Sequence, residues 1–329
     1  YISENYHRID NFEDILKRKK SLPTTFNELQ NRLESKILSK KLSKFHESQR
    51  KSKIKRMKAA FQLLILSDNT NEKTHYGYFG RKKLRVLFKE IENIIKRWHR
   101  KKHIDKNFLL EIPNELPFIF LPLQQEPERS LLISAPNYVN QLDTVEYVSK
   151  CIPEDYFLFV KEHPTQGSGR DWRKISDYQA MQNNQRVKLI HPSVSASEIV
   201  EKSKLVISVS GTLALESAFF NKPSITFVEN DYSFIPSVSR LKSKNELRQL
   251  IECSLEKKVE PNYVGKYFDV LEENSFIFDL LSFQVHYLKH FYYDSNLLDV
   301  QISDNQMMEF LINEKQNLEN LAQEFKKRI

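Results

Sequence analysis

From residue 118 onward, the sequence alternates between short apolar runs and longer segments with helical patterns. Five runs rich in β-branched and aromatic residues occupy 118–123, 156–160, 187–190, 205–209 and 224–228. Segments with helical patterns separate them at 137–151, 171–183, 195–203 and 212–220. Because the runs are apolar nearly throughout, they are typical of strands buried on both faces of a sheet. The alternation predicts an α/β fold with one Rossmann-like parallel sheet covered by helices.

Helices are expected on both sides of this sheet. Apolar residues recur at three- and four-residue steps across 26–45 and 84–98, and helical patterns return at 263–293 and 307–327. Ser195 with Glu198, and Ser243 with Glu246, match the capping box that begins a helix. We therefore predict three parts, which are a basic helical region at 1–116, the sheet domain at 117–257 and helices at 258–329.

Glycine is scarce, with six residues in a chain of 329. Their spacing matches neither the dinucleotide-binding glycine motif nor the P-loop motif, which excludes standard dinucleotide enzymes and P-loop NTPases. No sequence motif of a hydrolase or a metalloenzyme is recognisable, so we predict neither a metal site nor a cofactor. Cys151 and Cys253 lack metal-ligand spacing, which favours a reducing compartment.

Positive charge is concentrated in two stretches. Residues 36–60 hold ten Lys and Arg against one acid, and residues 81–103 hold ten against two. Such clusters fit a solvated helix face or an anionic lipid surface. Nucleic acid is not an expected partner, because no nucleic-acid-binding module is recognisable. The chain begins at Tyr1 rather than at methionine, so we expect that sequence upstream is missing.

Polar residues with useful chemistry follow the predicted strands. Ligands of an open parallel sheet bind beyond the carboxyl ends of its strands, so these residues are expected to share one crevice. They are Glu128 after the first strand, Lys161 and His163 after the second, and Ser210, Gly211, Thr212 and Glu216 after the fourth.

The turn after the fourth strand is a candidate phosphate site. Gly211 allows a close approach of the backbone, and the amides of a following helix favour an anion. Thr212 can add a hydroxyl donor, and Glu216 can accept hydrogen bonds from a ribose diol. An ordinary turn between a strand and a helix fits these residues as well.

The segments after the first two strands supply candidate catalytic groups. His163 can donate to a phosphate or a sugar hydroxyl, and Lys161 can compensate negative charge. Glu128 and Glu126 could serve as acid, base or acceptor anchor. His191 has the same His-Pro form as His163 but is the weaker candidate, and Ser193 and Ser195 are expected to cap the next helix.

Taken in order, these segments resemble the carboxyl-terminal domain of the capsule polysaccharide biosynthesis family, whose members include GT-B-type bacterial Kdo transferases. The matching residues are Pro122-Leu123, Pro127-Glu128, 158–164 (LFVKEHP), 187–190 (VKLI), Gly211-Thr212, Glu216, Ala218, Lys222-Pro223 and Tyr232. The sequence departs from the family pattern at Glu126, Ala214, Ser217 and Asn221.

The resemblance implies a glycosyltransferase that transfers a sugar from a nucleotide-sugar, with CMP-Kdo as a candidate donor, to a lipid-linked surface glycan. It places His163 and the Gly211-Thr212 turn near the donor phosphate, and Glu216 near the ribose. A cytoplasmic location at the inner face of the membrane follows. The fold implied is one Rossmann-like domain of a GT-B architecture, with residues 1–110 as its inter-domain helices and the second sheet domain missing.

Three alternatives stay open. A glycerol- or ribitol-phosphate polymer transferase would use a similar nucleotide site but transfer a phosphate-linked alcohol. A sugar-nucleotide epimerase would interconvert donors without an acceptor. A non-catalytic fragment would bind nucleotide or membrane without turnover.

Overall fold

The computed structural model describes residues 80–291 and 303–327, with gaps at 114, 127, 129, 164–165, 167–172, 261, 274–275, 277 and 279, and also residues 61, 64 and 65. The chain divides into two units, formed by 1–26 with 94–271 and by 27–93 with 272–329. The helix predicted across 26–45 and the basic stretch at 36–60 lie outside the described residues. The predicted three-part domain division stays a prediction.

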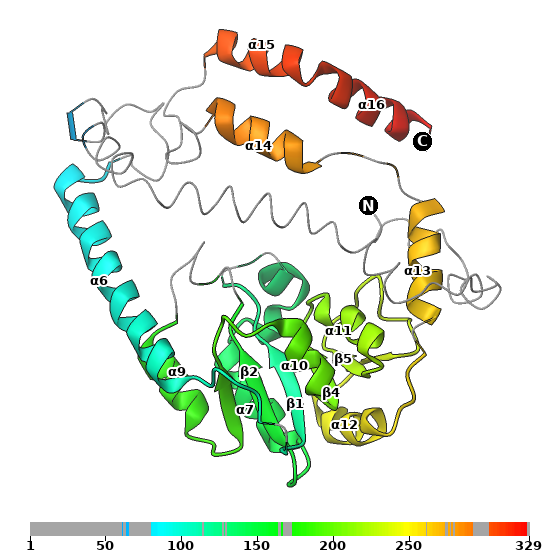
Figure 1. The fold of residues 1–329 in the computed structure, drawn as a ribbon. Helices are drawn as coiled ribbons and strands as arrows, with labels where there is room; N and C mark the ends of the chain where they lie inside the picture. Colours follow the sequence, from blue (N-terminus) through cyan, green and yellow to red (C-terminus); the bar gives the residue numbers. More distant parts are fainter. Residues whose placement is uncertain are drawn as a thin grey trace. The chain divides into compact units, whose positions relative to one another are not determined.

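The first unit contains a six-stranded sheet in the order β3-β2-β1-β4-β5-β6 (Figure 1). Its strands are β1 (Phe118–Pro122), β2 (Phe157–Lys161), β3 (Val187–Ile190), β4 (Leu205–Ser208), β5 (Ser224–Thr226) and β6 (Val238–Arg240). Every neighbouring pair is parallel. The α/β prediction is confirmed, and the strand order is that of the Rossmann fold. Strands β2 and β3 are added on one side of β1, and β4, β5 and β6 are added on the other side, so the strand order reverses between β1 and β4.

Both faces of the sheet are buried, as the apolar runs predict. Phe118 and Phe159 stack with ring centroids 4.1 Å apart, and neither side chain is exposed beyond 1%. Their face packs against α10 (Ala196–Lys202) through Ile199 and Val200. The opposite face packs against three longer helices, which are α7 (Gln141–Cys151), α9 (Ile175–Gln182) and α12 (Leu247–Leu255).

Short helical turns join these elements. A π-helical turn, η2 (Ser130–Ser134), and a 3-10 turn, η3 (Pro136–Tyr138), lead from β1 to α7. The helix predicted at 212–220 is a single turn of α-helix, α11 (Leu213–Glu216), followed by the 3-10 turn η4 (Ser217–Phe220). Asn221 ends it in the left-handed region, with φ of 56°.

Helix starts and one strand differ in part from the prediction. Ser243 and Glu246 form the expected capping box at η5 (Lys244–Glu246), with the Ser243 amide donating to the Glu246 carboxylate at 2.7 Å. Ser195 is the N-cap of α10, so the predicted helix start is confirmed, but the predicted capping box is absent, because the Ser195 side chain makes no capping hydrogen bond. Strand β6 was not predicted, since Ser239 and Arg240 leave it without an apolar run.

The remaining helices are α6 (Lys83–Asn107), α13 (Asn262–Glu273), α14 (Leu280–Phe291), α15 (Asp304–Asn313) and α16 (Lys315–Lys326). The single helix predicted at 307–327 is two helices, which meet at Glu314. In the second unit, Phe310 packs edge-on against Phe283 and Phe291 at centroid distances of 5.5 and 5.0 Å. None of the helices that the structure describes is both long and apolar enough to cross a bilayer.

Candidate functional site at the carboxyl ends of β1, β2 and β4

The turn after β4 lies where the strand order reverses. Gly211 follows β4, and its amide donates to the Ser208 hydroxyl at 2.9 Å. Gln124, which follows β1, donates to the same hydroxyl at 3.3 Å. A Cβ on Gly211 would lie 2.8 Å from the Gln124 amide nitrogen and 2.9 Å from Ser208 Oγ, so no larger residue fits without moving them. Close packing between the two central loops therefore requires glycine here.

Tyr232 holds this turn from the loop between β5 and β6. Its buried hydroxyl donates to the Gly211 carbonyl oxygen at 2.8 Å. Burial raises the pKa of Tyr232, and the nearby Asp231 and Glu216 carboxylates add to the effect. The hydroxyl therefore stays protonated and remains a donor at neutral pH.

The structure pairs two of the predicted ligand contacts with each other. The Thr212 hydroxyl donates to the Glu216 carboxylate at 2.7 Å, along one turn of α11. The amides of Ala214, Leu215 and Glu216 already bond to the carbonyls of Gly211 and Thr212. Within the described residues, the amides of Thr212 and Leu213 are the donors that this turn can still offer, because the first amides of a helix have no partner inside it. With only four residues, α11 contributes little dipole.

Ser210 places a buried hydroxyl oxygen at the same turn. This oxygen has no hydrogen-bond partner among the described residues. Since buried polar atoms are nearly always bonded, an unpaired one beside a glycine turn indicates a place for a polar ligand group.

Lys161 ends β2 with a side chain that is almost completely buried. The residue is 4% exposed, and burial lowers the pKa of its ammonium group. No ion pair or hydrogen bond of this ammonium occurs among the described residues. The nearby Glu162 carboxylate raises the pKa of Lys161 but is itself paired with Arg173, so the ammonium is a strong candidate to bind an anionic ligand.

His163 follows two residues later and is partly buried. Burial lowers the pKa of its imidazole, Glu128 opposes this by raising it, and Lys161 lowers it further. These three predicted residues thus lie within electrostatic reach of one another. The imidazole is neutral at pH 7, as a proton acceptor must be.

The residue between them, Glu162, belongs to a buried ion network centred on Arg173. The Arg173 guanidinium donates to the Glu162 carboxylate at 2.8 Å and to the Glu126 carboxylate at 2.6 Å. Burial raises the pKa of Glu162, and Arg173 opposes that rise. Tyr178 also donates to Glu162, at 2.9 Å. Arg173 therefore joins the segment after β1 to the segment after β2.

Two glutamines complete the anchoring of the loop after β1. The side chain of Gln141, from the first turn of α7, accepts from the backbone amide of Gln124 at 2.6 Å and donates to the Glu126 carboxylate at 2.5 Å. Gln166 accepts from the Glu126 amide at 2.8 Å. Glu126 is thus occupied by structural partners, whereas Glu128 is not bonded to any of these groups.

The predicted residues form two groups at one edge of the sheet. Lys161, His163 and Glu128 form the first group, and the turn from Ser210 to Glu216 forms the second. Only β1 separates β2 from β4, and two strand spacings place their ends about 10 Å apart. His191 stands apart, because it follows β3 and bonds to Ser193 at 2.6 Å and to Asp105 at 3.2 Å.

Sequence reasoning missed Arg173, Gln124 and Glu162. Glu162 lies inside the quoted segment 158–164, and its position beside Lys161 at a strand end was the available signal. Nothing local marks Arg173, whose partners lie 11 and 47 residues away. Among the described residues, no group of three side chains could hold a metal ion.

Replacing Arg173 by leucine is expected to lower the free energy of unfolding by about 3–5 kcal/mol at pH 7, because Glu162 would remain buried without its cation. Folded Glu162 would then keep a proton above the ordinary pKa of 4.5, so the stability of Arg173→Leu should fall as pH rises through and above that value.

Urea unfolding at several pH values measures this effect. The double variant Arg173→Leu/Glu162→Gln should lose the pH dependence and regain part of the stability. The control is Arg240→Leu, which breaks an exposed ion pair with Glu229 and should cost less than about 1 kcal/mol. Equal losses in Arg173→Leu and Arg240→Leu would contradict the role given to the network.

Known structures resemble parts of this fold. The beta Kdo 2,7 transferase of KpsC from Thermosulfurimonas dismutans shares 13% identity, with a TM-score of 0.35 over 53% of this chain and 53% of that one. The beta Kdo 2,4 transferase of the same KpsC shares 12% identity, with a TM-score of 0.34 over 63% of this chain and 61% of that one. The UDP-GlcNAc 2-epimerase from Methanocaldococcus jannaschii shares 16% identity, with a TM-score of 0.36 over 54% of this chain and 50% of that one.

The matches therefore extend over about half to three-fifths of the length of these solved chains. A search among curated protein sequences found no match. A family model described as capsule polysaccharide biosynthesis protein matches residues 16–239, which is more than half of the chain. The chain belongs to the capsule polysaccharide biosynthesis protein family.

Proposed function

We propose that this protein is a glycosyltransferase of capsule or surface polysaccharide synthesis, which transfers a sugar from a nucleotide-sugar to a lipid-linked glycan at the cytoplasmic face of the membrane. Membership of the capsule polysaccharide biosynthesis protein family supports a role in the synthesis of such polysaccharides. The observation that carries the proposal is the pair of unsatisfied groups at one sheet edge, the buried Lys161 ammonium and the buried Ser210 hydroxyl. Together they suit the phosphate of a nucleotide.

In this proposal, the donor phosphate lies between the ends of β2 and β4. Negative charge develops on the nucleoside phosphate as its bond to the sugar breaks, and fixed cations and donors stabilise that charge. Lys161 supplies the cation, while Ser210 and the amide of Thr212 supply hydrogen-bond donors. Glu216 accepts from the ribose with the carboxylate oxygen that Thr212 leaves free.

We assign proton transfer to His163. Its burial keeps the imidazole neutral at pH 7, so that it can take the proton of the acceptor hydroxyl as that oxygen attacks the sugar. Glu128 stabilises the imidazolium that results, because its carboxylate raises the pKa of His163. Arg173 keeps both loops in place through Glu126 and Glu162.

The neutral imidazole of His163 has one N–H, which would donate to the donor phosphate while its other nitrogen takes the acceptor proton. The variants His163→Ala and Glu216→Ala are therefore expected to bind the cognate nucleotide about tenfold more weakly, since each loses one hydrogen bond to it. Isothermal titration calorimetry with CMP, UDP and CDP measures the affinities and identifies the base. The matched controls are His191→Ala and Glu252→Ala, the latter at an exposed carboxylate of α12, and both should bind as the unmodified chain does. Unchanged affinity in both site variants would remove these assignments.

The rate of transfer is expected to fall on acidification, at a pH below the ordinary histidine value of 6.5, because His163 must be neutral and burial lowers its pKa. In Glu128→Gln, the carboxylate no longer favours the imidazolium, so the acid limb should move to lower pH while the maximal rate also falls. The pH profile of transfer by each protein tests this, with Glu252→Gln as the control. An acid limb that stays in place or moves upward would contradict the pairing.

The product of that assay separates the alternatives. A donor labelled in the sugar gives a labelled glycan if the proposal is right, whereas transfer of donor phosphorus into the product would indicate a polyol-phosphate transferase. Interconversion of donors without acceptor would indicate an epimerase. Nucleotide binding without turnover, in the full-length protein, would indicate a binding role only.

Helix α6 supports a membrane-facing role. Leu84, Phe88, Ile91, Ile95 and Trp98 form a stripe along four turns, and each side chain is 52–69% exposed. Lys and Arg outnumber Asp and Glu by nine to three in this helix. An exposed apolar stripe beside a basic face is typical of helices that lie in the interface of an anionic bilayer. We propose that α6 contacts such a surface near the acceptor.

Replacing Phe88 and Trp98 by alanine is expected to weaken vesicle binding about tenfold, because both rings would leave the bilayer interface. Co-sedimentation with vesicles of phosphatidylglycerol and phosphatidylcholine measures the binding, which should also fall with salt. Leu110→Ala removes an equally exposed side chain outside the helix and serves as control. Equal binding to neutral and anionic vesicles would refute the proposal.

A further inference from the structure

Gln124 follows the central strand β1, between the two groups of residues assigned to the nucleotide. Strand β1 lies between β2 and β4, and Lys161 and Ser208 are the last residues of those two neighbours. Gln124 is 8% exposed, and its side chain donates to the Ser208 hydroxyl at 3.3 Å. It therefore places a buried polar side chain at the middle of the candidate site.

Gln124, Lys161 and Ser208 share one face of the sheet. Successive side chains of a strand point to opposite faces, so residues two apart point the same way. Phe159 of β2 and Val206 of β4 belong to the buried cluster on the α10 face, and Lys161 and Ser208 follow them by two residues. Gln124 reaches the same face, since its side chain bonds to Ser208. Its amide thus lies on the side of the sheet from which Lys161 extends.

Hydrogen bonds fix the backbone of Gln124. Its backbone amide donates to the Gln141 side chain at 2.6 Å, and its carbonyl oxygen accepts from Gln141 at 3.0 Å and from Arg173 at 3.4 Å. The terminal amide of the side chain packs against Gly211, where a Cβ would lie 2.8 Å from its nitrogen. Rotation about the last side-chain torsion, which is broad in glutamine, is an easy motion for this amide.

The Ser208 hydroxyl lacks one hydrogen-bond partner in this arrangement. It is completely buried and accepts from the Gly211 amide at 2.9 Å and from Gln124 Nε2 at 3.3 Å. Its own proton has no acceptor among the described residues, although a hydroxyl can donate once. Gln124 Oε1 also has no partner within this part of the chain, and it is not fully buried.

A half-turn of the Gln124 amide improves this arrangement. The amide oxygen then faces Ser208, which donates to it while still accepting from Gly211. The amide nitrogen takes the outer position and presents its N–H groups there. A ligand atom that accepts hydrogen bonds at the outer position would therefore favour this orientation.

A phosphate oxygen is the acceptor that suits this position. The amide borders the Gly211 turn, and it shares its face of the sheet with the Lys161 ammonium. The Ser210 hydroxyl is a further buried and unpaired group at that turn. One cation together with neutral donors matches an anion that has several oxygens, because hydrogen bonds to a charged acceptor are the strong ones.

We propose that Gln124 is a ligand-binding residue of this site, and that its amide turns on ligand entry to donate from Nε2 to an oxygen of the donor phosphate. The proposal rests on the proposed function, because the phosphate is that of the nucleotide. Ser208 holds the turned amide by donating to its oxygen, and Arg173 and Gln141 hold the backbone from which it extends. The buried network thereby aims a neutral donor at the phosphate.

Two substitutions test this in the full chain, with affinities for CMP, UDP and CDP measured by calorimetry. Gln124→Met removes the donor and is expected to weaken nucleotide binding about tenfold, as loss of a hydrogen bond to a charged group should. Gln124→Glu keeps the shape of the side chain and can still accept from Ser208. It brings a carboxylate beside the phosphate, however, so binding should weaken about a hundredfold.

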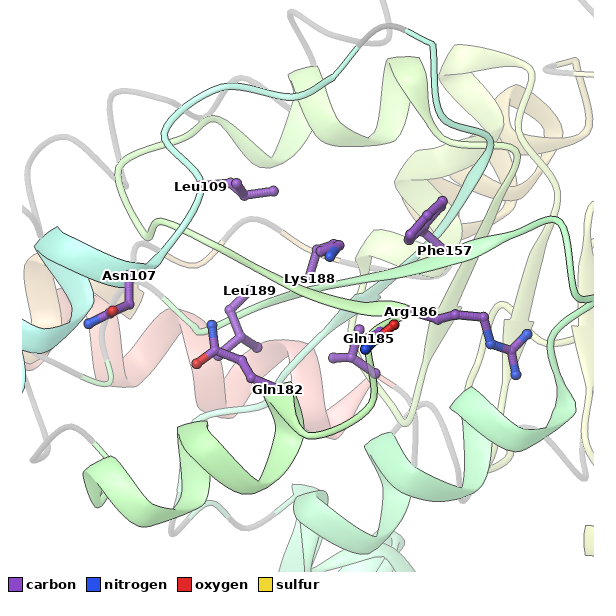
Figure 2. A pocket seen from close by; sticks show the side chains of 9 residues that line it. Asn107, Leu109, Phe157, Gln182, Gln185, Arg186, Lys188 and Leu189 are labelled. Carbon is purple, nitrogen blue, oxygen red and sulfur yellow. The ribbon is translucent and has the colours of Figure 1, made fainter.

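Gln185 supplies the matched controls. It is exposed and lines a cavity of about 610 Å³ beside β3 (Figure 2), which is a second place that could take a nucleotide. None of the residues assigned to the nucleotide lines that cavity. Gln185→Met and Gln185→Glu should bind as the unmodified chain does, and urea unfolding verifies that every variant is folded.

A spectroscopic measurement on the unmodified chain tests the contact directly. The side-chain amide of Gln124 gives signals in a proton–nitrogen correlation spectrum, and their absence from Gln124→Glu or Gln124→Met identifies them. These signals should shift when the protein is saturated with the nucleotide that binds most tightly. The corresponding signals of Gln185 should stay in place.

Each outcome decides the proposal. Unchanged affinity in both Gln124 variants, or an amide signal that ignores bound nucleotide, would overturn it and leave the transferase standing. Weaker binding by Gln124→Met with undiminished binding by Gln124→Glu would also overturn it, because the amide oxygen would then be the contact. Losses confined to the Gln185 variants would move the nucleotide to the β3 cavity, again against the proposal.

Failure of the proposed function gives a different result. If the unmodified chain binds none of the three nucleotides, the transferase is refuted, and inorganic phosphate becomes the probe for Gln124. A shift of its amide signal with phosphate would then support the contact. An amide signal that ignores phosphate as well would refute it.

Discussion

The guanidinium of Arg173 is the interaction on which the candidate site depends. It brings together two carboxylates from loops that follow different strands, and it is itself almost entirely buried. Removing two carboxylates and a cation from water is expensive, and the expense is offset only when each charge finds its partners. Glu162 immediately precedes His163, and Glu126 lies two residues before Glu128, so the network anchors the backbone next to both residues.

The order of the strands explains why the other half of the site lies nearby. Strands β1 and β4 are neighbours although they are far apart in the sequence, and the loops after them must leave in different directions. Gln124 and Gly211 both donate to the Ser208 hydroxyl between these loops, and a Cβ on Gly211 would have no room there. Tyr232 closes the same turn from a third loop. Three strand ends thus converge on one small region of the sheet edge.

Much of the sheet could be predicted from the sequence, because strands buried on both faces are apolar throughout and stand out against helical periodicity. Strand β6 was not predicted, because Ser239 and Arg240 are partly or fully exposed to solvent and leave it without an apolar run. The position of the site at the strand ends followed from topology alone. Arg173 could not be found in this way, since its partners are brought to it by tertiary folding and no local pattern encodes them. The helix after Gly211 was predicted too long, because a 3-10 turn has nearly the same apolar spacing as an α-helix.

The hydrogen bond between Thr212 and Glu216 has a consequence for turnover. In the absence of ligand, these two groups satisfy each other, so a nucleotide that engages the Thr212 hydroxyl exchanges one bond for another and gains little net free energy. In the proposed transferase, most of the attraction would then come from Lys161 and the phosphate charge. The nucleotide left after each addition would keep that phosphate, so its departure would depend mainly on how readily it separates from Lys161.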